Sequence, residues 1–174
     1  MLKRSVPPDP YAFLPELPSL RLLSDDVEEG GSLAGAHFLE GGNVSPALAW
    51  GPGPEGTVSY AVTCFDPDAP TPGGVWHWIL ADLPAHVLGL PAGGEPGIGR
   101  ALRNDLGTVG YAGAAPPPGD RAHRYIFAVH ALSVAELPVD EGTPAALTGF
   151  HLTLNSLARG TFTAHARTPV PTTA

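Results

Sequence analysis

Residues 57–83 read TVSYAVTCFDPDAPTPGGVWHWILADL, two apolar runs joined by a loop rich in proline and glycine. The runs 57–65 and 75–83 carry β-branched and aromatic residues, which favour strands. Proline and glycine punctuate the loop between them, as is typical of turns. The stretch therefore predicts two strands joined by a turn, with polar side chains at the strand ends.

A third apolar run, HRYIFAVHAL at 123–132, predicts a strand that is covered on both faces. His123, Tyr125 and two apolar residues alternate along one face, and the other face is also largely apolar. Such a strand belongs at the centre of a packed sheet. Gly 22 and Pro 21 in a chain of 174 residues disfavour long helices. These features predict a mainly β antiparallel sandwich with one or two short helices and long loops.

The composition predicts one folded domain with two irregular ends. We expect a proline-stiffened arm at 1–18, a single β domain at 19–166 and a flexible tail at 167–174. Within the domain, 20–39 suits a strand, a turn and a second short strand, and one short helix is expected near 144–149.

The net charge of −8, from 9 Lys and Arg against 17 Asp and Glu, disfavours nucleic acid as a partner. Any anion must therefore be held by local groups such as histidines or isolated arginines. The single cysteine, Cys64, excludes an internal disulfide and a thiolate zinc cluster. Prolines interrupt the N-terminal residues before a signal peptide or membrane span can form, so we predict a cytoplasmic protein.

Polar residues gather where the first two strands meet the loop. Asp66 follows an apolar run directly and precedes a proline, which restricts its backbone to extended conformations, and Asp68 lies in the loop. In VWHW, simple alternation places Trp76 and Trp78 on one face and His77 on the other. We expect Asp66 to meet His77, to raise the pKa of this histidine and to favour an imidazolium that binds anions, with both aspartates orienting and charging the histidines.

Each of these residues also has a purely structural interpretation. Aspartates that flank a proline are frequent turn formers, and His77 and His123 suit hydrogen-bonded core residues. Tyr125 suits simple packing on the face of His123. The other histidines have no supporting context and are taken as structural or surface residues: His37, His86, His130, His151 and His165.

The order of several motifs resembles a known family. SPALAW, FDPDAP, WHW and NDLGTVGYAGAAPPPGDRAHRYIFAVHAL follow one another from residue 43 to 132. This order and spacing resemble the phosphatidylethanolamine-binding proteins, also called Raf kinase inhibitor proteins, and especially their bacterial YbhB/YbcL branch. The resemblance implies a β-sandwich with a small, open, anion-accepting pocket near one end.

The resemblance also implies which residues form that pocket. Carried over position by position, they are Asp66, Asp68, His77, Gly113, Ala115, Pro117, His123 and Tyr125. Gly113 and Ala115 would line the pocket through their backbone. Ala115 stands where animal members have glycine, so we do not expect a ligand contact here that needs a backbone angle only glycine adopts readily. The eukaryotic C-terminal helix has no evident counterpart after Ala164.

We therefore expect a non-catalytic binding protein without a cofactor, a resident metal or catalytic residues. Its ligand would be a small anion such as phosphate, a phosphorylated head group or a carboxylate. One alternative is a metal-dependent hydrolase using Asp66, Asp68, His77 and His123, although HExxH and GxSxG motifs are absent. Another alternative, implied by the resemblance, is an inhibitor of a kinase or protease, or a regulator, that acts through a protein interface. The resemblance also implies a homodimer.

Overall fold

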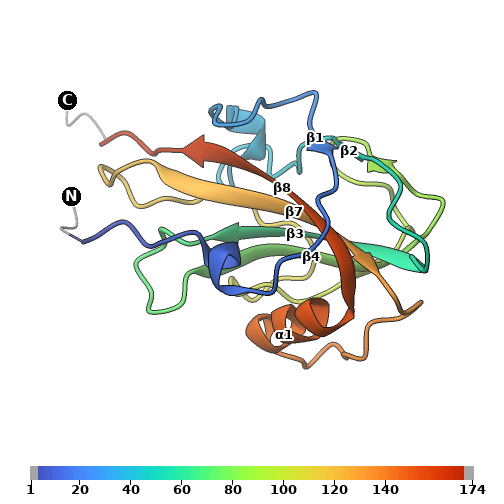
Figure 1. Ribbon diagram of the computed structural model, residues 1–174. Coiled ribbons are helices and arrows are strands. Elements are labelled where there is room, and N and C mark those ends of the chain that lie inside the picture. Colours follow the sequence, from blue (N-terminus) through green and yellow to red (C-terminus); the bar gives the residue numbers. More distant parts are fainter. Residues whose placement is uncertain (1–3, 171–174) are drawn as a thin grey trace.

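The computed structural model describes residues 4–170, and its largest element is a five-stranded antiparallel sheet (Figure 1). The strand order is β6-β4-β3-β7-β8, which places β3 at the centre. The strands of this sheet are β3 (Ser59–Asp66), β4 (Val75–Pro84), β6 (Arg100–Ala101), β7 (His123–Leu132) and β8 (Ser156–Ala166).

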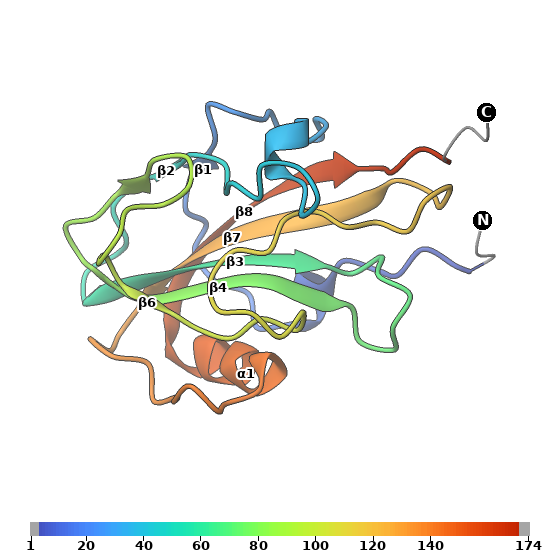
Figure 2. The same ribbon diagram turned by 180° about the vertical axis from the view of Figure 1, so that it is seen from behind.

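A smaller antiparallel sheet covers one face of the large sheet, and the helix α1 covers the other (Figures 1 and 2). The small sheet has the order β1-β2-β5 and consists of β1 (Leu22–Leu23), β2 (Leu48–Trp50) and β5 (Gly89–Leu90). The helical elements are η1 (Pro10–Phe13), η2 (Gly35–His37) and α1 (Ala145–Asn155), of which η1 and η2 are short 3-10 turns. The predicted class, a mainly β antiparallel sandwich, is confirmed.

Two hydrophobic cores lie on opposite faces of the large sheet. Every residue of β3 is buried, because β4 and β7 flank the strand and both faces are covered. Val62 and Cys64 contribute to the core under the small sheet, whereas Ala61 joins the core under α1. Alternate side chains of one strand therefore supply both cores.

The three predicted strands are confirmed to within two residues at each end. The helix expected near 144–149 is longer and continues to Asn155, where β8 begins at once. The second strand expected within 20–39 is wrong, because this part of the chain instead pairs with β8. The bond of Leu33 N–H to the carbonyl of His165 is one of its contacts, and η2 follows.

The N-terminal arm ends against the edge of β8, where the carbonyl oxygen of Pro18 accepts a hydrogen bond from the backbone N–H of Arg159 and the next residue, Ser19, forms a parallel bridge with Arg159. Residues 1–3 of the predicted arm and 171–174 of the predicted tail lie outside the described residues. Residues 167–170 form neither helix nor strand. Between residues 4 and 170, no helix is both long and apolar enough to cross a bilayer.

Gly160 in β8 provides a test of how closely the chain that follows this arm packs on β8. A Cβ atom at Gly160 would overlap the carbonyl oxygen of Leu20, so we expect Gly160→Ala to lower the free energy of unfolding by about 1–3 kcal/mol. Chemical denaturation measures the loss. Gly51→Ala is the matched control, because no atom of the described chain lies within 4 Å of the added Cβ. Equal stabilities of the two variants would contradict the packing.

Candidate functional site

The carboxylate of Asp66 joins the end of β3 to the start of β7. Its Oδ1 accepts a hydrogen bond from the backbone N–H of Asp68 at 2.7 Å, and its Oδ2 lies 2.8 Å from Nδ1 of His123. Asp66 and His123 are 2% and 1% exposed. Because β3 and β7 run antiparallel, the last residue of one lies beside the first residues of the other. Strand pairing thus builds this buried pair.

His123 has the environment of a charged histidine. Burial lowers its pKa, but the hydrogen bond and the charge of Asp66, followed by the hydrogen bond of Asp120, outweigh burial and raise the pKa above its ordinary value. Its Nε2 lies 3.2 Å from Oδ2 of Asp120 and 3.0 Å from Nη2 of Arg4. Both ring nitrogens of His123 are therefore engaged.

Asp68 contacts arginines and not histidines. Its Oδ2 accepts hydrogen bonds from Nε of Arg124 at 2.7 Å and from the backbone N–H of Arg124 at 3.0 Å, and its Oδ1 lies 2.9 Å from Nη2 of Arg121. Burial alone would raise the pKa of Asp68, but these partners outweigh burial and lower it. The expectation that Asp68 orients a histidine is wrong, since its carboxylate holds the loop before β7.

His77 lies in a β-bulge, which alternation along the strand does not predict. Cys64 pairs with Trp78 while the next residue, Phe65, pairs with Trp76, so His77 is an extra residue in β4. Trp78 consequently joins the core under the small sheet, and Trp76 packs against the core under α1. The expectation that the two tryptophans share a face is therefore wrong.

The hydrogen bonds of His77 define its tautomer. Nδ1 lies 2.9 Å from the carbonyl oxygen of Ala112 and 3.1 Å from that of Gly113. Since carbonyl oxygens only accept, Nδ1 carries the proton and Nε2 is an acceptor in the neutral ring. The ring meets the edge of Tyr125 at a centroid distance of 5.0 Å.

The charge predicted for His77 is wrong. Burial lowers its pKa, and the raising effects of the Ala112 carbonyl and of Asp66 do not compensate. His77 is therefore the neutral histidine of the pair, and His123 is the one that favours the imidazolium.

Gly113 is required by close packing. A Cβ atom at this position would lie 2.5 Å from the backbone nitrogen of Leu39 and 2.6 Å from the carbonyl oxygen of His37. Its N–H donates to Oδ1 of Asn43 at 2.8 Å. This arrangement holds the carbonyl of Gly113 against His77.

Ala115 and Pro117 lie on the loop beyond Gly113. The N–H of Ala115 donates to the hydroxyl of Tyr125 at 3.1 Å, and the backbone of Ala115 does not enter the positive-φ region. Alanine at this position is therefore unstrained. Ala115 and Pro117 line a pocket of about 390 Å³ whose opposite wall comes from residues 35–41.

Four charged residues of the site were not predicted: Arg4, Asp120, Arg121 and Arg124. Nη1 of Arg4 lies 2.6 Å from Oδ2 of Asp120, and its Nη2 donates to the carbonyl oxygen of Asp68. Burial would raise the pKa of Asp120, but hydrogen bonds from Arg4 and His123 lower it well below its usual range. In the sequence, the segment GDRAHR places the other three residues within three positions of His123, and this proximity could have identified them. No motif near Arg4 indicates that it belongs to the site.

The carboxylates and guanidinium groups at this site balance one another in number. Three of the nine Lys and Arg residues of the chain gather here, opposite three aspartates. The raised pKa of His123 favours its protonated form, and a protonated His123 gives this site one positive charge in excess.

The residues proposed as metal ligands do not form a metal site. Within residues 4–170, no group of three or more His, Cys, Asp or Glu side chains is arranged to hold a metal ion. Arginines already occupy both oxygens of Asp68.

The opposite behaviour of the two histidines can be measured by NMR titration. We expect the pKa of His123 above about 6.5, the ordinary value for histidine, and that of His77 below it. Asp66→Asn should lower the pKa of His123, because it removes the main stabilising charge. Exposed His86 is the internal control. A lower pKa for His123 than for His77 in the native protein would contradict the arrangement.

The contact between Asp66 and His123 makes the stability of the protein depend on pH, with a sign that follows from the raised pKa of His123. The pKa of His123 is raised on folding, so its contribution is complete below about pH 6.5 and is lost as the pH rises through the raised value. The excess stability of the native protein over Asp66→Asn should therefore shrink as the pH rises through this range. Urea denaturation of both proteins at several pH values measures it, and a growing difference would overturn the assignment.

Known proteins resemble this chain over most of its length. It is 44% identical to YbhB of Escherichia coli over 156 residues, which cover 83% of this chain and 98% of YbhB. It is 40% identical to YbcL of the same organism over 163 residues, which cover 87% and 89% of the two chains.

Two solved structures are also similar to this chain. The crystal structure of Escherichia coli YbcL, described as a new member of the mammalian PEBP family, matches with a TM-score of 0.81 at 39% identity over 86% of this chain and 98% of that one. A homologue from Chlamydia trachomatis matches with a TM-score of 0.74 at 26% identity, covering 84% and 96%. The family model for phosphatidylethanolamine-binding protein matches residues 23–167. This chain therefore belongs to the phosphatidylethanolamine-binding protein family.

Proposed function

We propose that this protein is a non-catalytic binding protein that takes a small anion between His77 and His123. The observation that carries the proposal is the local charge: in a protein of net charge −8, three arginines pair with the aspartates of this site, and one of them, Arg4, lies 3.0 Å from a buried histidine whose pKa is raised. Phosphate, a phosphorylated head group or a carboxylate fits this chemistry. The name of the family, which refers to a phospholipid, supports the same class of ligand.

The two histidines have different tasks in this proposal. His123 supplies charge, since Asp66 stabilises its imidazolium. His77 holds its only proton at Nδ1 against two carbonyl oxygens, so it must take up a second proton at Nε2 before it donates to an anion. Anion binding is therefore coupled to proton uptake and is tighter at low pH.

Arg4 supplies the guanidinium nearest His123, with Nη2 at 3.0 Å from the ring nitrogen. Its positive charge lowers the pKa of His123, which the aspartates raise. A bound anion would offset that repulsion. Arg4 thus links the N-terminal arm to the occupancy of the site.

Titration with inorganic phosphate, phosphoethanolamine and acetate tests the proposal. We expect the imidazole NMR signals of His77 and His123 to move, with tighter binding at about pH 6 than at about pH 8 because His77 must be protonated. His77→Gln and Arg4→Gln should weaken binding, whereas His86→Gln, at an exposed position, should not. Unchanged histidine signals at millimolar ligand, or equal binding at both pH values, would contradict the proposal.

The remaining functional expectations stay predictions. A non-catalytic role predicts no turnover of phosphate or carboxylate esters with or without added divalent metal, and sustained turnover would refute it. A cytoplasmic location, a homodimer and inhibition of a kinase or protease are likewise predictions. Light scattering at tens of micromolar protein measures self-association directly.

A further inference from the structure

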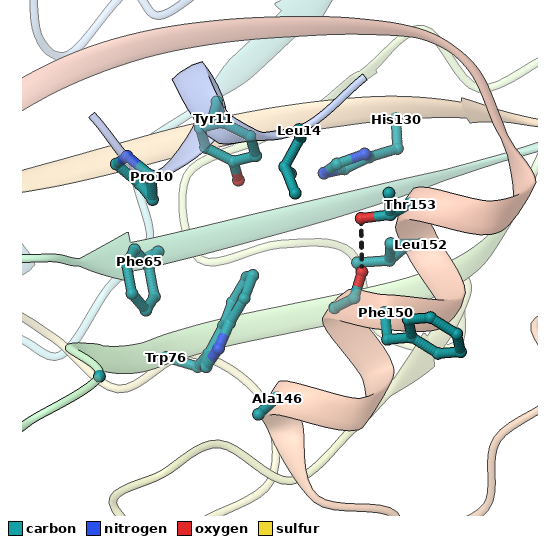
Figure 3. A pocket seen from close by; sticks show the side chains of 12 residues that line it. Pro10, Tyr11, Leu14, Phe65, Trp76, His130, Ala146, Phe150, Leu152 and Thr153 are labelled. Carbon is teal, nitrogen blue, oxygen red and sulfur yellow. Dashed lines mark hydrogen bonds between the residues drawn. The ribbon is translucent and has the colours of Figure 1, made fainter. Parts of the chain in front are cut away.

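A second pocket opens on the face of the large sheet opposite the histidine pair. It lies between η1 and α1 and has a volume of about 390 Å³, within the usual range of small-molecule sites (Figure 3). The aromatic side chains of Tyr11, Phe65, Trp76 and Phe150 line it. The bulge at His77 creates this arrangement, because it turns Trp76 away from Trp78 and against Phe65, with ring centroids 4.8 Å apart.

A glycine in α1 lets the helix pack closely against one wall of this pocket. Gly149 lies inside α1, where glycine normally weakens a helix. A Cβ atom there would approach the ring of Trp76 to 3.0 Å. The glycine therefore lets α1 lie close to the tryptophan, while the exposed side chain of Phe150 stands at the rim.

The pocket contains a buried acceptor of defined tautomer. His130 is 3% exposed, and its Nδ1 lies 3.0 Å from Oγ of Ser156. That hydroxyl donates its own proton to the carbonyl oxygen of Leu152 at 2.6 Å, so Nδ1 of His130 must be the donor in this pair. Nε2 is then a bare acceptor, and it finds no hydrogen-bond partner within residues 4–170.

The charge state of His130 agrees with this geometry. Burial, helped by the positive charge of Arg159, lowers the pKa of His130 to about 3, so the ring is neutral. The ring extends toward Tyr11 and Leu14 in the pocket (Figure 3). A buried acceptor without a partner is unfavourable, and a ligand that donates to it would remove the penalty.

Tyr11 adds a second polar group at the same place. Its ring centroid lies 6.3 Å from that of His130, and its buried hydroxyl lacks a partner of hydrogen-bond geometry among the described residues. Burial raises the pKa of Tyr11 to about 12, against the lowering effects of the Thr63 hydroxyl and Arg159, so the phenol is neutral. The guanidinium carbon of Arg159 lies over the Tyr11 ring, 4.6 Å from its centroid.

We propose that this pocket binds a neutral, largely aromatic or aliphatic molecule that carries a hydroxyl group, which donates its proton to Nε2 of His130. An anion would face the lone pair of Nε2, and a cation would be repelled by Arg159. Neither charged class fits. The aromatic walls supply the apolar contact, and the tautomer held by Ser156 selects a donor over an acceptor.

Binding of para-ethylphenol, compared with its methyl ether, tests the proposal. The two probes have similar apolar surface, but only the phenol donates a hydrogen bond. We expect the phenol to bind about fivefold more tightly, the affinity ratio that corresponds to one net hydrogen bond. The ¹⁵N signal of His130 Nε2 should move with the phenol and not with the ether. Ligand-observed NMR and calorimetry give both affinities.

Three variants separate the causes. His130→Phe keeps a ring but removes the acceptor, so the preference for the phenol should vanish. Ala146→Phe adds bulk at the exposed pocket wall and should weaken both probes, and it serves as the second test if His130→Phe does not fold. Leu147→Ala, on the outward side of the helix, should change neither affinity.

Defined outcomes would overturn the proposal. These are equal affinities for phenol and ether, no binding at millimolar probe, or displacement of the phenol by phosphate with shifts at His77 and His123. A protein dimer could exclude both probes, which would then bind only after dilution to the monomer. If the monomer bound the phenol no more tightly than the ether, the pocket would be reassigned to a dimer interface. Phosphate binding at the histidine pair is measured separately, so either proposal can fail alone.

Discussion

The burial of β3 on both faces constrains the rest of the molecule. All residues of Ser59–Asp66 lie buried between β4 and β7, so successive side chains must fit two different cores. Asp66 ends the strand inside protein, where an unpaired carboxylate would be strongly unfavourable. Antiparallel pairing brings His123 to the same end of the sheet, and Nδ1 of His123 provides the carboxylate with a partner at 2.8 Å.

Other buried carboxylates also need positively charged partners, and these pairings hold the surrounding loops in place. Asp68 and Asp120 are each 2% exposed, and Asp68 is paired with two guanidinium groups and Asp120 with one, all from segments distant in sequence. The N-terminal arm takes part on both faces of the large sheet: Arg4 reaches Asp120, and Tyr11 lines the aromatic pocket. One irregular segment of the chain thus contributes to both proposed sites, although only packing on the sheet gives it a structure.

Local sequence predicts those parts of the fold that local chemistry governs. Runs of β-branched and aromatic residues between proline and glycine turns predict the three long strands, and the strongest of them, 123–132, matches β7 at both ends. The segment 20–39 is different, because Ser32, where a second strand was expected, forms a bridge with His165 of β8, more than a hundred residues away. A short segment that pairs with a distant sheet edge shows no hydrophobic periodicity of its own from which it could be predicted.

The sequence by itself determined that Asp66 stands at a strand end, that two histidines enter the same region and that the chain is related to phosphatidylethanolamine-binding proteins. Only the tertiary structure decided which histidine favours a charge. Desolvation and the nearest partners control a pKa, and both depend on distant segments. The bulge at His77 likewise arises from pairing with β3 and is invisible in VWHW alone. It separates the two tryptophans, and with them the two faces on which we place ligands.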